Sequence, residues 1–323
     1  MNHLPKLVEQ TAQDISDFLS KCPEGLVLIY GPTATWKTRL SIWLSEFFDI
    51  EIISADSRQV YKYMDIGTDK ASQDIRHKIP HHQIDIIDPN EIYTAWERQI
   101  DTYRIIEDIK SCHKIPFIVW WTGLYIDTLY YNFTLPAIPP DMDYRKRLES
   151  IELEYPGALR SKLEQIDPVE AKKHHKKSIR YIIRALEIHH QTWQLKSQIM
   201  QRQPIKYPIL MIGIEQDVDI WNKLIDKRIL QMLDNGLIDE VKWLLDKWYI
   251  PDTNSLQTID YKQVIWYLRW EYDYENMIKK LEIAHHQLAK KQRTRFRRYK
   301  NDMQNHPVEN VVYKFYHLSK FQY

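Results

Sequence analysis

The sequence predicts an α/β protein with a parallel-sheet core, a helical insertion and a helical C-terminal region. Residues 24–53 read as strand, loop, helix and strand, which is the opening βαβ unit of a parallel sheet. Apolar runs at 115–119 and 208–214 can add strands to that sheet. Residues 141–200 and 218–299 show helical spacing instead. Prolines on both sides of the first helical stretch indicate an insertion in the sheet domain.

These patterns divide the chain into three segments. Residues 24–135 are expected to form the first part of the core, and residues 136–204 the helical insertion. Residues 205–323 then carry the last core strand and the C-terminal helices.

The loop after the first strand, from Gly31 to Thr38, follows the phosphate-binding pattern GxxxxGK[ST] with one departure. Gly31, Lys37 and Thr38 match, but Trp36 stands in place of the second glycine. This pattern makes the predicted core P-loop NTPase-like. In such a loop, backbone N–H groups turn inward to cradle a phosphate, so an indole at this position would compete with the anion for space.

The glycine and tryptophan contents suggest an explanation for Trp36. The chain has 7 Gly and 11 Trp, whereas roughly 23 Gly are ordinary at this length. Five tryptophans end a strand-like run or follow helix-like stretches where glycine is common: Trp120, Trp121, Trp193, Trp248 and Trp270. We hypothesise that many of the tryptophans are glycine codons translated with the wrong genetic code. The alternative is a tryptophan-rich chain with a decayed loop, and UGG codons at positions 36, 120 and 121 would favour it.

Composition limits the class of protein. With 323 residues and 44% hydrophobic content, the chain is long enough for about two folded domains. It has no run of 18 apolar residues and no basic-then-apolar N-terminus, which predicts a cytoplasmic protein without membrane attachment. Cys22 and Cys112 are far apart and lack metal spacing, so neither a disulfide framework nor a zinc site is expected.

Two basic runs favour a nucleic-acid partner. Residues 289–300 contain seven basic residues and no acid, with Phe296 and Tyr299 interleaved for stacking or packing. Residues 172–184 contain six Lys or Arg. Such runs suit a phosphate backbone, although each could equally be a solvated helix face.

A carboxylate follows the second predicted strand. Asp56, in the segment from Ser54 to Gln59, lies where parallel sheets bind ligands. It is therefore a candidate general base or magnesium ligand, and it could equally cap the following helix. Thr122 follows the third predicted strand and could reach the same crevice.

Seven segments in order resemble those of the tRNA dimethylallyltransferase family (tRNA isopentenyltransferases). They are GPTATWKT, EIISADSRQVYKYMDIGTDK, PHHQIDIIDP, TGLYID, IIRALEI, QMLDNGLIDEV and KKQRTRFRR, spanning roughly residues 25–300. The family has GPTASGKT and GGTGLYI, so Trp36 and the pair Trp120 and Trp121 depart from it. Asp260 is a further departure, because the family usually has glycine there.

The resemblance implies transfer of a dimethylallyl group from dimethylallyl diphosphate to N6 of the adenine next to the anticodon, position 37 of tRNA. It assigns Asp56 as the base and Thr122 as the residue that positions the amine. It implies a Mg²⁺ near Thr38 and a monomer that binds the tRNA anticodon stem-loop. The implied diphosphate-binding residues are Gly31, Thr33, Ala34, Thr35, Trp36, Lys37, Thr38 and Arg228. The implied tRNA-binding residues are Asp56, Ser57, Arg58, Gln59, Arg180 and Arg184.

Three other functions stay open from the sequence. An adenylate isopentenyltransferase would use a free nucleotide, which needs no long basic surface. A P-loop small-molecule kinase would transfer phosphate from ATP. An inactive tRNA-binding relative is expected if Trp36 is genuine.

Overall fold

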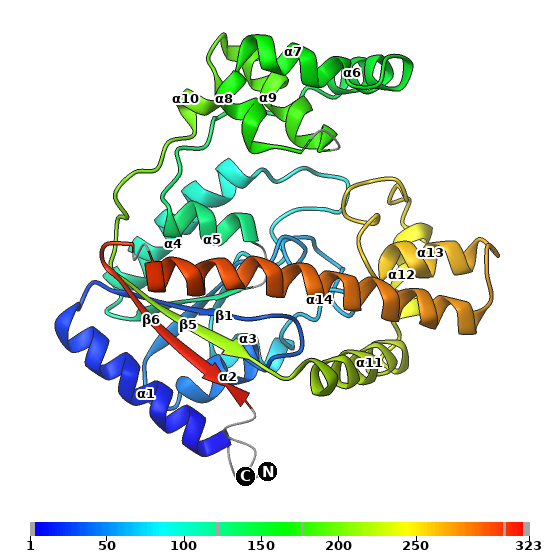
Figure 1. The fold of residues 1–323 in the computed structure, drawn as a ribbon. Coiled ribbons are helices and arrows are strands. Elements are labelled where there is room, and N and C mark those ends of the chain that lie inside the picture. The colour runs from blue at the N-terminus through cyan, green and yellow to red at the C-terminus, as the bar shows by residue number, and fades with distance from the viewer. Residues whose placement is uncertain (1–3, 121–122, 176–177, 306–307, 319–323) are drawn as a thin grey trace. The chain divides into compact units, whose positions relative to one another are not determined.

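The structure is a computed structural model that describes residues 4–120, 123–175, 178–305 and 308–318. It forms two compact units (Figure 1). Unit 1 comprises Met1–Tyr93, Asp101–Ile126 and Ile205–Tyr323, and unit 2 comprises Thr94–Ile100 and Asp127–Pro204. The range of the expected insertion, 136–204, therefore falls entirely within unit 2, which also includes residues before it.

Unit 1 is built on one parallel sheet, which confirms the predicted fold class. Its strands in the described residues are β1 (Leu26–Tyr30), β2 (Ile50–Ser54), β3 (His81–His82), β4 (Ile115–Trp120), β5 (Ile209–Glu215) and β6 (Val311–His317). Their order across the sheet is β3-β2-β4-β1-β5-β6. The central strand β1 pairs in parallel with β4 and β5, so that Val27 lies opposite both Phe117 and Leu210. Its run LVLIY is buried throughout, as expected of a parallel strand covered on both faces.

Helices complete unit 1. They are α1 (Leu4–Lys21), α2 (Lys37–Leu44), α3 (Gln73–Lys78), α11 (Val218–Asp234), α12 (Leu237–Asp246), α13 (Tyr261–Leu268) and α14 (Tyr274–Asn305). Helices α4 (Ala95–Ser111) and α5 (Gly123–Tyr130) run across the division between the units.

The alternation of β1 side chains determines what covers each face of the sheet. Val27 and Ile29 join a core formed with α1 and α2. Tyr30 points the other way and packs edge-on against Phe296 and Tyr299 of α14, with ring centroids 5.3 and 5.6 Å apart. A separate apolar cluster joins α11, α12, α13 and α14 to the loop after β2.

Unit 2 contains the short helices α6 (Met142–Glu154), α7 (Ala158–Ile166), α8 (Pro168–Lys173), α9 (Ile179–Thr192) and α10 (Lys196–Ile199). Leu148, Leu163 and Leu186 lie in its core. Glu187 is fully buried, but Arg145 and Arg184 neutralise it at 2.7 and 2.5 Å. Buried charge of this kind is tolerated because it is paired.

The sequence analysis did not predict helices α3, α4 and α5, and three further elements at the margins of the fold were also missed. The amphipathic helix α1 precedes the first predicted strand. Strand β3 is only two residues long and lies inside the segment expected to be a loop. Strand β6 is an edge strand whose run VVYKFYH includes a lysine, so it lacks the continuous apolar signal of the central strands.

Candidate active site

A large cavity in unit 1 lies at the carboxyl ends of β1 and β2. Its volume is about 1120 Å³, and its walls come from the loop before α2, the segment 56–59, the loop 67–72, and helices α11 and α14. Ligands of open α/β sheets bind at this edge. The cavity therefore brings together the predicted phosphate loop and the predicted base, Asp56.

At Trp36 the phosphate loop has a backbone conformation that suits the glycine of the motif. Ala34 and Trp36 have φ of 57° and 66°, the left-handed region that favours glycine. Trp36 precedes the first residue of α2, so the helix N-terminus faces the loop. The guanidinium of Arg39 lies 4.5 Å from the centre of the Trp36 ring, and the Trp43 ring lies 6.4 Å away.

Three more tryptophans share this backbone conformation. Trp193, Trp248 and Trp270 have φ of 58°, 65° and 61°, and each lies at or just after the end of a helix. Their side chains are 83%, 88% and 91% exposed. Left-handed residues after helix ends are usually glycine, and an indole exposed to this extent buries little apolar surface. These positions support the hypothesis that glycine codons were read as tryptophan.

Lys37 lies under the loop. It is buried, and its ammonium donates to the Pro32 carbonyl at 2.5 Å and lies 3.4 Å from the Thr35 hydroxyl. Burial, and then the charge of Arg228, lower the pKa of Lys37 to about 7, although Asp56 opposes the shift. The lysine therefore holds its proton weakly when no anion is bound, and a bound anion would favour the charged form.

Thr33 connects the loop to two C-terminal helices. Arg228 of α11 donates to the Thr33 hydroxyl and lies 3.4 Å from the carboxylate of Asp69. Gln292 of α14 accepts from the Thr33 N–H at 3.1 Å. The buried Nε2 of Gln292 has no hydrogen-bond partner among the described residues, and Gln292 lines the cavity. This donor was not predicted from the sequence, because it lies in the basic run that was assigned to nucleic acid.

The segment after β2 is arranged by its own hydrogen bonds. One carboxylate oxygen of Asp56 accepts from the Arg58 N–H at 2.6 Å, which orients the candidate base. Gln59 accepts from Ser54 at 2.6 Å and donates to the Thr68 and Asp69 carbonyls. The Arg58 guanidinium donates to the Asn254 carbonyl at 2.9 Å.

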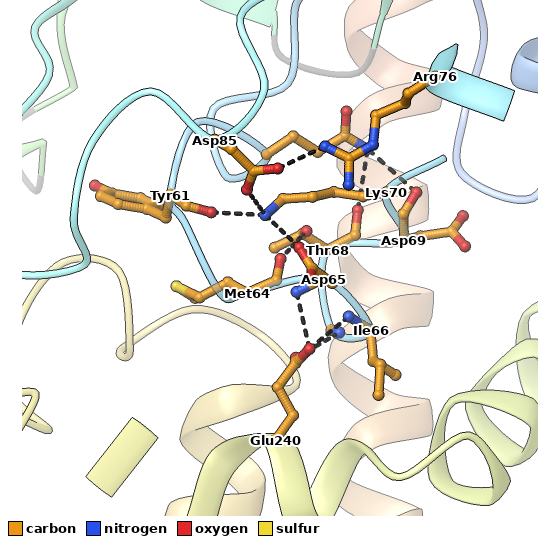
Figure 2. Close-up of polar contacts among 12 residues, drawn as sticks. Tyr61, Met64, Asp65, Ile66, Thr68, Asp69, Lys70, Arg76, Asp85 and Glu240 are labelled. Carbon is orange, nitrogen blue, oxygen red and sulfur yellow. Dashed lines mark hydrogen bonds and ion pairs between the residues drawn. The ribbon is translucent and has the colours of Figure 1, made fainter. Parts of the chain in front are cut away.

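The loop that contacts Gln59 is anchored by buried charges (Figure 2). Lys70, with a side chain only 1% exposed, pairs with Asp65 and Asp85 at 2.7 and 2.6 Å. Arg76 reaches the second oxygen of Asp85 at 2.5 Å. Burial works against ionisation of Asp85, but the hydrogen bonds from Lys70 and Arg76 outweigh it and lower its pKa.

Glu240 of α12 anchors the same loop from the other side (Figure 2). Its carboxylate accepts from three successive N–H groups, those of Asp65, Ile66 and Gly67, at 2.8, 2.8 and 3.2 Å. It also accepts from the Tyr261 hydroxyl at 2.6 Å. Gly67 is required here, because a Cβ would lie 2.4 Å from the Tyr261 ring. The sequence analysis did not single out Glu240.

Asp260, which stands where the family usually has glycine, forms a pair with His285. The two side chains are 2.6 Å apart, nearly fully buried, and both residues line the cavity. Asp260 has φ of 80°, which explains why glycine is common at this turn. The pair introduces a carboxylate and an imidazole that a glycine would not supply.

The other site residues predicted from the sequence are spread over both units. Gly31 is buried, and a Cβ there would lie 2.7 Å from the Ile214 carbonyl oxygen. Thr38 is exposed and Ser57 is half-buried, and both residues line the cavity. Arg180 is exposed in unit 2. Thr122 and Trp121 lie outside the described residues.

A family model described as IPP transferase matches residues 59–299, more than half of the chain. The chain belongs to the IPP transferase family. The family includes a relative named tRNA dimethylallyltransferase from Thermotoga neapolitana, 39% identical over 85% of this chain and 90% of the relative. The relative of that name from Halothermothrix orenii is 40% identical over 84% of each chain.

Solved structures of tRNA-modifying transferases match this chain in fold and sequence. The full-length tRNA isopentenylpyrophosphate transferase of Bacillus halodurans is 37% identical, with a TM-score of 0.63 over 91% of this chain and 90% of that one. A eukaryotic dimethylallyltransferase acting on tRNA is 25% identical, with a TM-score of 0.71 over 89% and 82%. Within the described residues, no helix is long and apolar enough to cross a membrane.

Proposed function

We propose that this IPP transferase moves a dimethylallyl group from dimethylallyl diphosphate to N6 of the adenine at position 37 of tRNA and releases diphosphate. The observation that carries the proposal is the shared cavity, in which the phosphate loop with Lys37 and the carboxylate of Asp56 line one hollow. The names of the relatives support dimethylallyl transfer to tRNA.

The loop is suited to a diphosphate leaving group. Negative charge develops on the departing oxygen, and preorganised donors lower the barrier most where that charge appears. Lys37, Arg228 and the loop amides of residues 33–38 supply such donors. The buried Nε2 of Gln292 adds a donor on the α14 side of the cavity.

Thr38 is suited to help hold Mg²⁺. The residue is exposed and lines the cavity in the first turn of α2. The described residues contain no cluster of three His, Cys, Asp or Glu side chains that could hold a metal ion, so diphosphate oxygens and water would complete the coordination. When bound, the ion neutralises charge on the diphosphate.

Asp56 is suited to be the base. The N6 lone pair attacks C1 of the dimethylallyl group, the C1–O bond breaks, and its electron pair leaves with the diphosphate. The proton of N6 passes to the Asp56 carboxylate, which the Arg58 N–H orients. We retain Thr122 as the residue that positions the amine.

The adenine must leave its stack to reach this cavity. Ser57, Arg58 and Gln59 are the candidates that hold it, and Arg58 and Gln59 would exchange their present bonds to the protein for bonds to RNA. Arg180 and Arg184 are the candidates that contact the anticodon stem. We expect the protein to meet its tRNA acceptor in the cytosol, and we expect it to act as a monomer.

A transfer assay tests the proposal. The chain as written, Trp36→Gly and the double variant Trp36→Gly, Asp56→Asn are incubated with dimethylallyl diphosphate, Mg²⁺ and an unmodified anticodon stem-loop, and the nucleosides are identified by mass spectrometry. We expect N6-dimethylallyladenosine from Trp36→Gly, and a kcat lowered about 10²- to 10⁴-fold when Asp56 becomes Asn in that background.

Other outcomes separate the alternative functions. Prenylation of free AMP but not of the stem-loop would indicate an adenylate isopentenyltransferase. Phosphate transfer from ATP would indicate a kinase. Binding of tRNA without transfer by both the tryptophan and the glycine forms would contradict the proposal.

A further inference from the structure

A second cavity lies at the same edge of the sheet. Its volume is about 310 Å³, and it opens at the carboxyl ends of β1, β5 and β6. Gly31 and Pro32 line it, whereas Thr33 to Thr38 line the large cavity. Helix α14 also separates the two, because Phe296 and Lys300 face the small cavity while Gln292 faces the large one. A volume above 300 Å³ is within the range of small-molecule sites.

Aromatic rings form much of its wall. Tyr30, Trp221, Phe296 and Phe315 line it, and the Tyr30 ring contacts both phenylalanines edge-on at 5.3 and 6.2 Å. Gly213 makes room for this arrangement, because a Cβ there would lie 2.7 Å from the Phe315 ring. Such walls favour a flat apolar group.

A buried donor in the wall lacks a partner. The Tyr30 hydroxyl is buried, the residue is only 2% exposed, and no described residue bonds to it. Burial, and then the charge of Glu215, raise the pKa of Tyr30 well above its ordinary value, so the hydroxyl keeps its proton. Buried hydroxyls are normally satisfied, and a ligand oxygen in the cavity would satisfy this one.

The charge of the lining is positive. Arg293, Arg297 and Lys300 line the cavity. Glu215 is the single carboxylate among the lining residues. Lys300 lies 3.0 Å from Glu215, and the Arg293 guanidinium lies 5.2 Å from the centre of the Trp221 ring. The buried Nε of Arg293 has no hydrogen-bond partner among the described residues. This excess of cations favours an anionic ligand.

We propose that the small cavity is a second binding site, for a small molecule with a flat apolar group and one carboxylate or phosphate. The apolar group lies among the aromatic rings and the acidic group faces the arginines and Lys300. The site is distinct from the proposed diphosphate site, so both can be occupied together.

Naphthalene-2-carboxylate and 2-naphthyl phosphate are the probes, and their binding to the Trp36→Gly protein is measured by calorimetry with and without saturating inorganic diphosphate. Diphosphate occupies the phosphate loop, so saturable binding of either probe reports on the small cavity. We expect Arg297→Ala with Lys300→Ala to weaken binding about tenfold through loss of charge-assisted contacts. Tyr30→Phe removes only the hydroxyl and is expected to weaken binding severalfold. Lys290→Ala, an exposed change on the same helix that lines neither cavity, is the matched control.

Three results would overturn the proposal. They are no saturable binding of either probe, displacement of the probe by diphosphate, and equal affinity in the Lys290→Ala protein and the Arg297→Ala, Lys300→Ala protein. The stronger probe identifies whether the acidic group is a carboxylate or a phosphate. Because the readout is binding rather than prenyl transfer, it is independent of the outcome of the transfer assay.

Discussion

Tryptophan is an unfavourable residue for the backbone that Trp36 adopts. A left-handed conformation costs a residue with a Cβ roughly 1–2 kcal/mol, and glycine escapes this cost. Trp221 shows the contrast, because it lies in a helix, is 1% exposed and donates to the Thr33 carbonyl. Its indole is buried and hydrogen-bonded, whereas the indoles of Trp193, Trp248 and Trp270 are 83%, 88% and 91% exposed.

Trp36→Gly is expected to strengthen diphosphate binding and to raise the free energy of unfolding by about 1 kcal/mol. The glycine relieves the left-handed strain and removes the indole from beside the loop amides. Calorimetric titration with inorganic diphosphate and thermal unfolding measure the two effects.

Trp43→Gly is the matched control for this change, because Trp43 lies inside α2 and is expected to be a genuine tryptophan. Glycine in a helix interior costs about 1 kcal/mol, so this variant should be less stable. Equal losses of stability in both variants would contradict the argument for Trp36. UGA rather than UGG at codon 36 would support it independently.

The pH dependence of diphosphate binding should follow Lys37. Its pKa in the empty site is about 7, below the ordinary 10.5, so binding above pH 7 requires uptake of a proton. Affinity should therefore fall by up to about tenfold per pH unit above that value. The unfolded chain holds this proton up to pH 10.5, so Lys37 also makes the free energy of unfolding rise with pH between 7 and 10.5.

Titrations of diphosphate at several pH values, with Lys37→Met in the same buffers, check this expectation. The variant keeps any pH dependence of the diphosphate itself and loses that of the lysine. Identical pH profiles for the two proteins would rule out Lys37 as the titrating group.

At the scale of elements, the loop from Met64 to Lys70 depends on distant helices for its conformation. One carboxylate, Glu240, satisfies three of its N–H groups, and buried Lys70 anchors its end. The loop in turn holds Gln59 through two carbonyls. The conformation of the segment after β2 is therefore set partly by α12.

Glu240→Gln should loosen this loop. The amide keeps the size of the side chain but has one acceptor oxygen fewer, which leaves N–H groups unsatisfied at a cost of about 1–3 kcal/mol. We expect faster amide hydrogen exchange at residues 65–67 and a higher KM for tRNA in the transfer assay. Asp239→Asn, an exposed neighbour in α12, is the control. Unchanged exchange at these amides would show that Glu240 does not hold the loop.

At the scale of the whole molecule, binding of tRNA should depend on charged residues of unit 2 that contact its phosphates. Arg180→Ala is expected to raise the KM for tRNA and to reduce the salt dependence of tRNA binding by about one released counterion. The KM for dimethylallyl diphosphate should not change. Lys162→Ala removes an exposed charge from another helix of unit 2 and serves as control. Equal salt slopes for wild type and Arg180→Ala would exclude Arg180 from the RNA contact.

Much of unit 1 was predictable because its signals are local. The central strands are continuous apolar runs, and the phosphate loop is a short motif between a strand and a helix. The C-terminal helices were expected from their apolar spacing. Strand β6 was missed because an edge strand need not be apolar on both faces.

The sequence by itself determined the parallel-sheet class, the position of the phosphate loop and the location of Asp56 after a strand, because each depends on residues adjacent in the chain. Only the tertiary structure brought Gln292 to Thr33, 259 residues away, and Glu240 to the loop after β2. It also paired Asp260 with His285. These contacts join separate helices to one sheet edge, and packing of the whole unit decides them rather than any local pattern.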